Sequence, residues 1–585
     1  MYEKLVAVND AWAEEGKARQ ILEPESRYYG GTVDPATGIA WVNHTTGTPT
    51  VMAFWGAALV NPDSAFYRDE VLLERLKLAA EFVLRLQHED GSISPGWTNS
   101  HSPPDTAFVV VGYAQLVQLL ARDASAWEPL APVVERMKLF LERTVPVLLT
   151  GGCHTPNHRW VLCAALGFLH EIFGLEEAVQ RADQWLAEGM DITPDGEWTE
   201  RSNGIYSAVS DLMLIHAARL LQRPELLEPV RRNLRMMTYL VHPSGEIVTD
   251  YSGRQDLGQY HDLSPYYLPY AILAHLDRDP VFAGMARLAG DALTGPGVVS
   301  TNVLVRMMLE PELRQPSVEP ALIPTRYEKL LNGEFLRADY LAGMEAAGHN
   351  GRIFHSRLHT EFGAPVARYR DGDTSVTLMT ETPSFFALRH GKVRLLAVQI
   401  ASYFCPGYIP MQEMTVLENG YKLEGEHKKG YYGPVAETLL PATSREPVSP
   451  WYLLPHHSRL ITHEQKIRVT VEALRSDRGW ELKVVCAEPL DVMTQISLVF
   501  GSEGEFVAGE FQDNDSDTLL WSGGTARYEC GGDWVELTGG ELAHLSTGVR
   551  EAGLPPHCKT LLVNVMTPFA KTIGLTLSPG TKREK

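Results

Sequence analysis

The fold is decided by residues 71–93, which read VLLERLKLAAEFVLRLQHEDGSI. The first sixteen residues place apolar side chains at the i, i+3, i+4 spacing of an amphipathic helix. A short turn around Gly91 follows, and an extended step leads towards the next helix. The same plan returns at residues 193–198 and 242–247. Repeated helical hairpins of this kind predict a ring of helix pairs, an α/α toroid.

Further stretches with helical apolar spacing follow along the chain. They span residues 106–120, 133–149, 160–173, 177–190, 206–221, 225–241, 265–276 and 280–293. Their period is too irregular for a solenoid array. Prolines between Pro311 and Pro324 break the helical pattern, which indicates a boundary near residues 310–325. One more helical stretch is expected at residues 337–347.

A different pattern occupies residues 350–580. Short β-rich segments, often alternating, are separated by turns rich in Gly and Asp, which predicts an all-β sandwich of about 230 residues. The segments are 365–369, 374–379, 392–401, 466–472, 481–486 and 560–566. We therefore expect an α+β multidomain protein. Its domains are an incomplete α/α toroid at 1–324, then a linker and an antiparallel β-sandwich at 325–585.

Composition describes an ordered, aromatic-rich protein, with 44% hydrophobic residues, 12 Trp and 22 Tyr. The formal net charge of −21 and the lack of a basic stretch before the C-terminal tail argue against nucleic-acid binding. An acidic ligand would need a locally positive site. Six cysteines without a CxxC pair indicate neither a zinc ribbon nor a disulfide framework.

The N-terminal residues and the apolar runs indicate where the protein is expected to act. Residues 1–10 read as the start of an amphipathic helix and carry no signal-peptide pattern. We found no run of about 18 apolar residues, so no membrane span is expected. The sequence predicts a cytoplasmic protein, or a secreted one if a leader has been removed.

Two segments stand directly before strongly apolar helical runs: TPNHRW at 155–160 and ERSNGIY at 200–206. A helix N-terminus favours an anion, because its free N–H groups and its dipole point there. The first segment supplies Asn157, His158 and Arg159, and the second supplies Arg201, Asn203 and Tyr206. The alternative interpretation is that Asn157 is a helix cap and that Tyr206 only packs on a neighbour.

These residue types suit the removal of a proton next to a sugar carboxylate, followed by loss of the glycosidic oxygen. A group must neutralise the carboxylate, a base must take the proton, and an acid must protonate the leaving oxygen. Asn and His fit the first role. Tyr or His fits the second, and Tyr fits the third, because its hydroxyl both accepts and donates.

Two more polar clusters precede helices. Residues 250–262 contribute Arg254, Tyr260 and His261, and the alternative for them is an ordinary surface loop. Residues 97–105 contribute Trp97, which can stack on a sugar, and Asn99, which can hydrogen-bond one, unless this is a packed Trp beside a capping loop. His355, near Arg357 and His359, starts the β region and is a weaker candidate.

The Asn157-His158 pair, the later Tyr206, the toroid-then-sandwich plan and the late His355 together resemble heparinase II/III-type and alginate-lyase-type polysaccharide lyases. The resemblance implies cleavage of uronic-acid polysaccharides by β-elimination. In that family scheme Asn157 neutralises the carboxylate, Tyr206 is the general acid and for some epimers the base, and His158 is neutraliser or base. His261 or His355 supplies the second histidine.

The resemblance also sets expectations about ligands. It implies an acidic polysaccharide or oligosaccharide as partner, with imported oligosaccharides favoured by the missing leader. No cofactor is required. Some relatives hold a structural metal in the sandwich, and no metal ligands are recognisable here. Association into a homo-oligomer is left open.

Two rival functions fit the same sequence. A glycoside hydrolase on the same toroid needs two carboxylates across the cleft. Candidates for them are Asp105, Asp195, Glu200, Asp211 and Asp250. The second rival is a carbohydrate-binding protein without catalysis.

Overall fold

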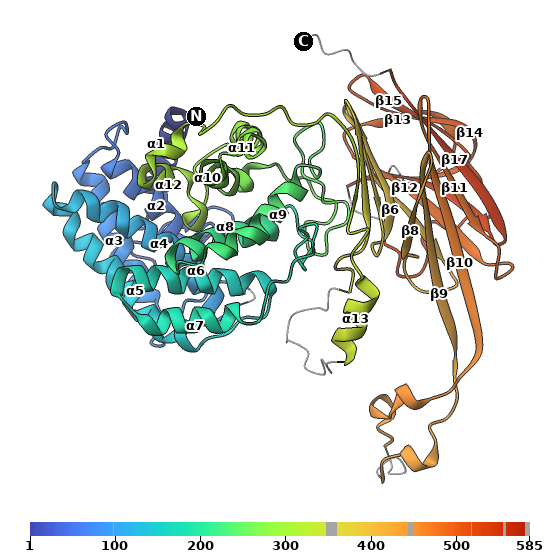
Figure 1. Cartoon of the computed structure of the whole chain (residues 1–585), viewed down its shortest axis with the longest axis horizontal. Coiled ribbons are helices and arrows are strands. Elements are labelled where there is room, and N and C mark those ends of the chain that lie inside the picture. The colour runs from blue at the N-terminus through green and yellow to red at the C-terminus, as the bar shows by residue number, and fades with distance from the viewer. Residues whose placement is uncertain (98, 347–359, 443–447, 516, 554–556, 580–585) are drawn as a thin grey trace. The chain divides into compact units, whose positions relative to one another are not determined.

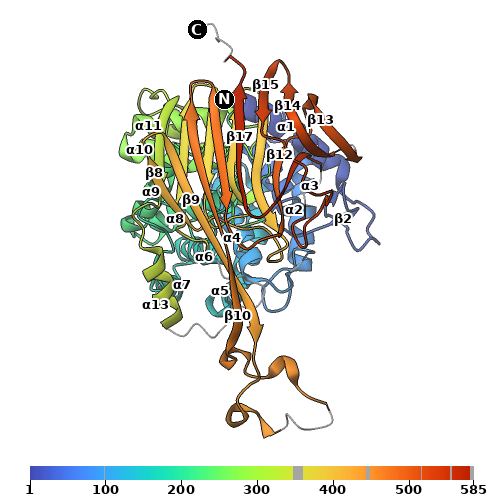
Figure 2. The same ribbon diagram turned by 90° about the vertical axis from the view of Figure 1, so that its right-hand side faces the viewer.

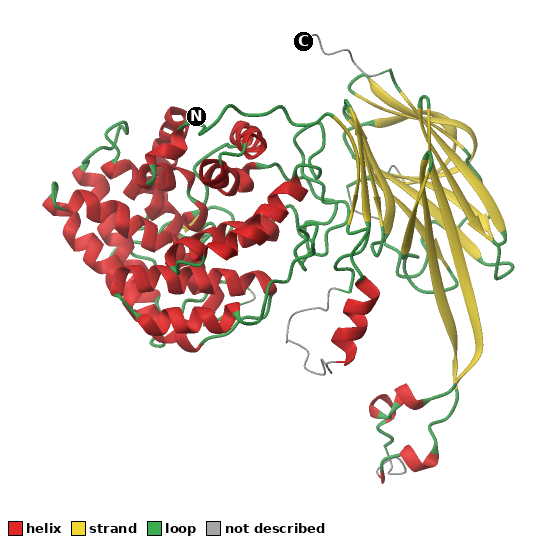
Figure 3. Ribbon diagram, viewed as in Figure 1, coloured by secondary structure: helices red, strands yellow, loops and turns green. Residues whose placement is uncertain are grey.

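A computed structural model describes the chain except residues 98, 347–359, 443–447, 516, 554–556 and 580–585. Contacts divide it into two compact units (Figure 1). The helical unit comprises residues 1–324 and 334–363, and the β unit comprises residues 325–333 and 364–585. Figure 3 shows the change from helices to strands along the chain. The fold class predicted from the sequence is confirmed.

Five helices form the inner layer of the helical unit, and each packs against the next. They are α2 (Thr48–Val60), α4 (Pro103–Ala124), α6 (Pro156–Phe173), α8 (Tyr206–Leu220) and α10 (Tyr267–Asp277). Every residue of α2 is buried. Helices that are apolar on all sides belong in the interior of a domain, which explains why this layer is covered.

Five further helices form the outer layer, and each packs on the inner helix before it in the chain. They bury only one stripe of side chains, as amphipathic helices do. They are α3 (Glu70–Leu86), α5 (Ala131–Thr150), α7 (Glu176–Leu186), α9 (Leu227–Met237) and α11 (Pro280–Ala292). Because the layers alternate along the chain, the inner helices share one direction, and their N-termini lie at the same end of the unit.

Three further α-helices belong to the described part of the helical unit. α1 (Tyr2–Arg19) packs on α2, and α12 (Val303–Leu309) contacts α1, α2 and α4. α13 (Arg337–Ala346) follows the first strand of the β unit in the chain. The inner layer thus runs from α2 to α10 as an arc of helix pairs, which is the incomplete α/α toroid that the sequence predicted.

One helix departs from the expectation about apolar runs. α4 is long and apolar enough to cross a membrane by length and composition. However, 89% of its most apolar 18-residue window is buried inside the helical unit, so it serves as a core helix.

The repeated glycine turns connect outer helices to inner ones. In each turn, the backbone N–H of the first residue donates to the carbonyl four residues later, and its own carbonyl accepts from the glycine N–H. In the third turn these bonds are His242 N to Glu246 O at 2.7 Å and Gly245 N to His242 O at 3.0 Å. Gly91, Gly196 and Gly245 all have positive φ, which favours glycine. These turns set where the chain enters α4, α8 and α10.

Fifteen strands of the β unit form one continuous hydrogen-bonded sheet. Its pairs are antiparallel except for β14 with β16. The path runs β3-β4-β5-β6-β7-β12-β16-β14-β15-β17-β11-β10-β9-β8, with β13 beside β14. The strands are β3 (Arg326–Leu331), β4 (Val366–Asp371), β5 (Thr374–Met379), β6 (Ser384–His390), β7 (Val393–Ser402), β8 (Glu413–Leu417), β9 (Gly420–Tyr432), β10 (Ile461–Ser476), β11 (Gly479–Cys486), β12 (Met493–Phe500), β13 (Glu505–Asp515), β14 (Thr518–Cys530), β15 (Asp533–Thr538), β16 (Lys559–Met566) and β17 (Phe569–Leu577).

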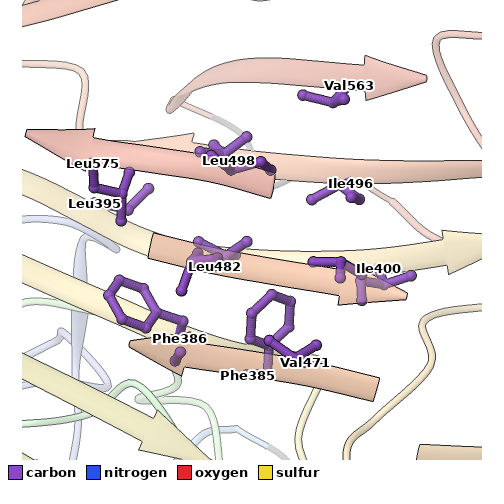
Figure 4. Close-up of a cluster of buried hydrophobic side chains, with 14 of the residues drawn as sticks. Phe385, Phe386, Leu395, Ile400, Val471, Leu482, Ile496, Leu498, Val563 and Leu575 are labelled. Atoms are coloured by element: carbon purple, nitrogen blue, oxygen red, sulfur yellow. The ribbon is translucent and has the colours of Figure 1, made fainter. Parts of the chain in front are cut away.

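The sheet curls so that its two halves face each other across one apolar core (Figure 4). Phe386 on β6 meets Trp480 on β11 edge to face, with ring centres 5.7 Å apart. Leu395 and Leu482 from opposite halves belong to the same buried cluster. Packing of two layers through one core is a sandwich, although hydrogen bonds link all of its strands.

Candidate active site

Polar segments precede every inner helix at the shared N-terminal end. They are residues 43–47 before α2, 97–102 before α4, 154–158 at α6, 200–205 before α8 and 250–262 before α10. Aligned helix N-termini add their dipoles, so this end of the unit favours negative charge. Contacts between the segments join them into one cluster, whose centre is Glu200.

Glu200 connects three of the segments. Its Oε2 accepts hydrogen bonds from the backbone N and from Nδ2 of Asn157, at 3.2 and 2.6 Å. Its Oε1 forms an ion pair with Arg254. Glu200 and Asn157 are buried, whereas Arg254 keeps some exposure. The capping interpretation of Asn157 is wrong, because the N-cap of α6 is Thr155 and the Asn157 amide binds Glu200 instead.

Tyr206, the first residue of α8, lies beside the same arginine. The Arg254 guanidinium sits over the Tyr206 ring, 4.5 Å from its centre. Gln255 Nε2 donates to the Tyr206 hydroxyl at 2.5 Å. The phenol is therefore held by two neighbouring residues of the 250–262 loop, with a positive charge against its face.

His158 lies in the first turn of α6 and contacts α4. Its ring packs edge to face on Phe108 and on His154. Burial, with smaller electrostatic effects from His154, Arg254 and His44, lowers the pKa of His158 to about 3. His158 is therefore neutral at neutral pH.

Several polar atoms in this cluster are buried without a hydrogen-bond partner among the described residues. They include Nδ1 of His158 and Oδ1 of Asn157. Buried polar atoms in native proteins are almost always hydrogen-bonded, so unpaired ones at a functional site need an explanation.

His44 extends the cluster towards α2. Its ring stacks on Phe108, with centres 4.2 Å apart, and its Nδ1 lies 3.8 Å from Asp105 Oδ1. Burial lowers the pKa of His44 to about 4 despite the opposing effect of Asp105. Asp105 is fixed by Asn99 Nδ2, which donates to it at 2.9 Å. Trp97 meets the His44 ring edge to face and is half exposed.

His261, on the 250–262 loop before α10, lies against the segment that precedes α8. A Cβ atom on Gly204 would lie 2.8 Å from the His261 ring, so the ring packs directly on this glycine. Asp256 holds the segment through Gly204 N at 3.0 Å and Ser202 Oγ at 2.9 Å. Nε2 of His261 is buried and has no hydrogen-bond partner in the described structure.

Three of the predicted ligand-binding residues are engaged in internal contacts. Arg159 pairs with Asp191 at 2.6 Å and donates to the 188–189 turn. Arg201 is fully buried, pairs with Glu197 at 3.3 Å and lies over the Tyr251 ring. Asn203 Nδ2 donates to Val248 O and Tyr251 Oη. These contacts position the segments and leave Arg254 as the arginine of the cluster.

Tyr260 is 60% exposed on the 250–262 loop. His355 lies outside the described residues. Within the described part of the chain, no group of three or more His, Cys, Asp or Glu is placed to hold a metal ion.

Sequence reasoning missed four members of the cluster: His44, Phe108, His154 and Gln255. It considered Glu200 only as a hydrolase carboxylate. A usable signal existed for His44, because the polar run 43–48 precedes an apolar helix exactly as the other segments do. The partnership of Asn157 with Glu200 had no such signal, since 43 positions separate them.

Neither a protein-family model nor a curated protein matches the sequence. Solved structures do share the fold. A crystal structure of heparinase III aligns with a TM-score of 0.54 and 12% identity, covering 98% of this chain and 85% of that one. The chondroitin AC lyase of Streptomyces coelicolor A3, in complex with chondroitin sulphate, gives 0.51 and 13%, covering 100% and 80%.

A second heparinase III structure aligns with a TM-score of 0.52 and 9% identity, over 98% of this chain and 84% of that one. These identities establish the fold alone. The protein has a polysaccharide lyase fold over nearly its whole length.

Proposed function

We propose that the helical unit cleaves uronic-acid-containing glycans by β-elimination and leaves an unsaturated uronic acid at the new end. One observation carries the proposal: Asn157, Glu200, Arg254 and Tyr206 form a connected chain of contacts beside the neutral His158. The cluster lies where the inner helices present their N-termini. The chain shares the fold of the solved structures named heparinase III and chondroitin AC lyase.

The substrate carboxylate binds beside the Glu200 carboxylate, near the N-terminus of α6. Asn157 has a second amide hydrogen beyond the one donated to Glu200, and the Arg254 guanidinium has further N–H donors beyond its pair with Glu200. His158 is too weak a base at its lowered pKa to take a carbon-bound proton. As a neutral imidazole it donates a hydrogen bond to the carboxylate, which withdraws charge from the adjacent carbon.

Tyr206 moves the protons. The C–H bond next to the carboxylate breaks and its electron pair forms the carbon–carbon double bond, while the bond to the glycosidic oxygen breaks. The leaving oxygen takes a proton from the Tyr206 hydroxyl. The carbon-bound proton goes to one of two groups, depending on which face of the sugar carries it. It goes to His261, packed against Gly204, or to Tyr206 as a phenolate, which then returns that proton to the leaving oxygen.

The arrangement of carboxylates favours a lyase over a glycoside hydrolase. Hydrolysis needs two carboxyl groups open to the cleft. Four of the five candidates are buried and held by internal contacts: Asp105 by Asn99, Glu200 by Asn157 and Arg254, Asp211 by Trp198, and Asp250 beside His242. The fifth candidate, Asp195, lies in a glycine turn.

The test is a screen of uronic-acid polymers and their oligosaccharides, read by absorbance near the ultraviolet edge. A lyase creates a conjugated double bond, so absorbance rises with at least one substrate. Loss of absorbance from unsaturated oligosaccharides would identify the hydrolase instead. Tight binding with no product from any substrate would identify a binding protein.

A further inference from the structure

A long hairpin, defined here as the arm (residues 425–442 and 448–468), extends from the β unit. β9 and β10 pair along their whole length, but β8 reaches only residues 420–424 and β11 only residues 469–476. Residues 425–432 and 461–468 are therefore a two-stranded ribbon, with no further strand on either edge in the described structure. Figures 1 and 2 both show it leaving the rest of the β unit.

The arm gathers exposed apolar side chains. Its 39 described positions carry nine of the 28 exposed large hydrophobic residues of the described chain. At its tip, Tyr452 and Leu453 are 89% and 86% exposed. The nine are Tyr431, Tyr432, Leu439, Val448, Trp451, Tyr452, Leu453, Leu460 and Ile461. Isolated ribbons are marginally stable, and exposed apolar side chains gathered on one protruding element are typical of an interaction site.

The chemistry of the arm selects its partner. A glycan would account for the aromatic rings, but not for the exposed Leu, Val and Ile side chains, which sugars do not need. Arm residues 425–442 and 448–468 carry five Lys or Arg and three Glu, a formal charge of +2, in a chain of −21. An acidic protein surface suits that charge, and the rest of this chain is such a surface.

We propose that the arm docks on a second copy of this chain. Two arms of equal sign repel one another, so each arm lies against the acidic body of its partner in a two-fold dimer. Its four exposed aromatic residues alone offer on the order of 500 Å² per arm. Two arms then approach the roughly 1,200–2,000 Å² of a stable interface. This inference does not depend on the proposed reaction.

The experiment is sedimentation velocity of the full chain across a concentration series. Wild type is expected to be a dimer, and the triple variant Trp451→Ser/Tyr452→Ser/Leu453→Ser a monomer with unchanged circular dichroism. These side chains are exposed, so the fold does not require them. The matched control is Leu322→Ser/Leu336→Ser, equally exposed positions away from the arm, which should remain dimeric.

A second experiment tests the role of charge. Lys428→Glu/Lys466→Glu should weaken the dimer at low salt, and raising the salt should weaken wild type. A monomeric wild type at every concentration, or a tip variant that still dimerises, would overturn the proposal. Binding of wild type, but not of the tip variant, to anionic lipid vesicles without dimerisation would overturn it in favour of a membrane.

Discussion

Helix starts in the helical unit differ in what their polar residues do. At α3, Asp69 caps the helix by accepting from Leu72 N at 2.6 Å, and at α11 Asp279 accepts from Val281 N at 2.8 Å. The N-cap residues of α6 and α8, Thr155 and Ile205, make no side-chain cap bond. The aspartates at the starts of α3 and α11 cap their helices, whereas Asn157 and Glu200, at the starts of α6 and α8, bind each other.

The largest effect is expected from a substitution at the start of α8, an inner helix. Tyr206→Phe removes the hydroxyl that accepts from Gln255 and, in the proposed reaction, moves the protons. We expect kcat to fall by about 10²–10⁴-fold with the thermal transition unchanged. Tyr67 also has an arginine over its ring, at 5.2 Å, so Tyr67→Phe is the matched control and should keep full activity. Near-normal turnover by Tyr206→Phe would refute the assigned role.

The turns that place these helix starts can be compared with each other. A methyl group on Gly196 would lie 2.4 Å from Arg232 O, whereas Gly245 has open space, and both have positive φ. Gly245→Ala should cost about 1–2 kcal/mol from the backbone conformation alone. Gly196→Ala should cost a further ~2 kcal/mol from crowding. Equal unfolding free energies in urea would show that the crowding is relieved.

Acid should destabilise the inner starts through their histidines. The pKa values of His158 and His44 in the folded protein, about 3 and about 4, lie below the ordinary value near 6.5. The unfolded chain therefore binds more protons below pH 6.5, and stability falls as pH drops from 6.5 towards 4. Each histidine contributes up to about 1.4 kcal/mol per pH unit.

Urea unfolding at several pH values measures this slope. His158→Gln and His44→Gln should each flatten it between pH 6.5 and 4. Slopes identical to wild type in both variants would mean that these histidines are protonated in the folded protein.

The smallest effect is expected from a substitution at the start of α3, an outer helix. Asp69→Ala removes the cap of α3 and should lower stability by about 1 kcal/mol while activity stays unchanged. Thr155→Ala at α6 should cost less than half of that, because its hydroxyl makes no cap bond. Thermal melts of both variants measure these losses. A larger loss of stability for Thr155→Ala than for Asp69→Ala would mean that α6 is capped in solution.

Local patterns in the sequence predicted much of the fold. The outer helices and their glycine turns were recognisable because an amphipathic stripe and a positive-φ glycine are local features. α2 was not predicted from the sequence, because every one of its residues is buried and it has no amphipathic stripe. β5 was predicted at its observed bounds, but the neighbourhood of β7 with β12, or of β11 with β17, depends on pairing between distant residues.

The site was predictable in its parts and not in its connections. Asn157, His158 and Tyr206 were recognisable as polar residues before apolar helices. Nothing in the sequence distinguishes Arg201, which is buried against Glu197, from Arg254, which lies over Tyr206. Side-chain direction depends on the packing of residues about fifty positions apart.

The mass of the products tests the central claim most directly. Wild type is incubated with a uronic-acid oligosaccharide that raises absorbance in the screen, in water labelled with heavy oxygen. The account predicts fragments that together weigh the same as the substrate, with no label incorporated, and no fragments from Tyr206→Phe. Fragments heavier by one labelled water would contradict β-elimination and establish hydrolysis.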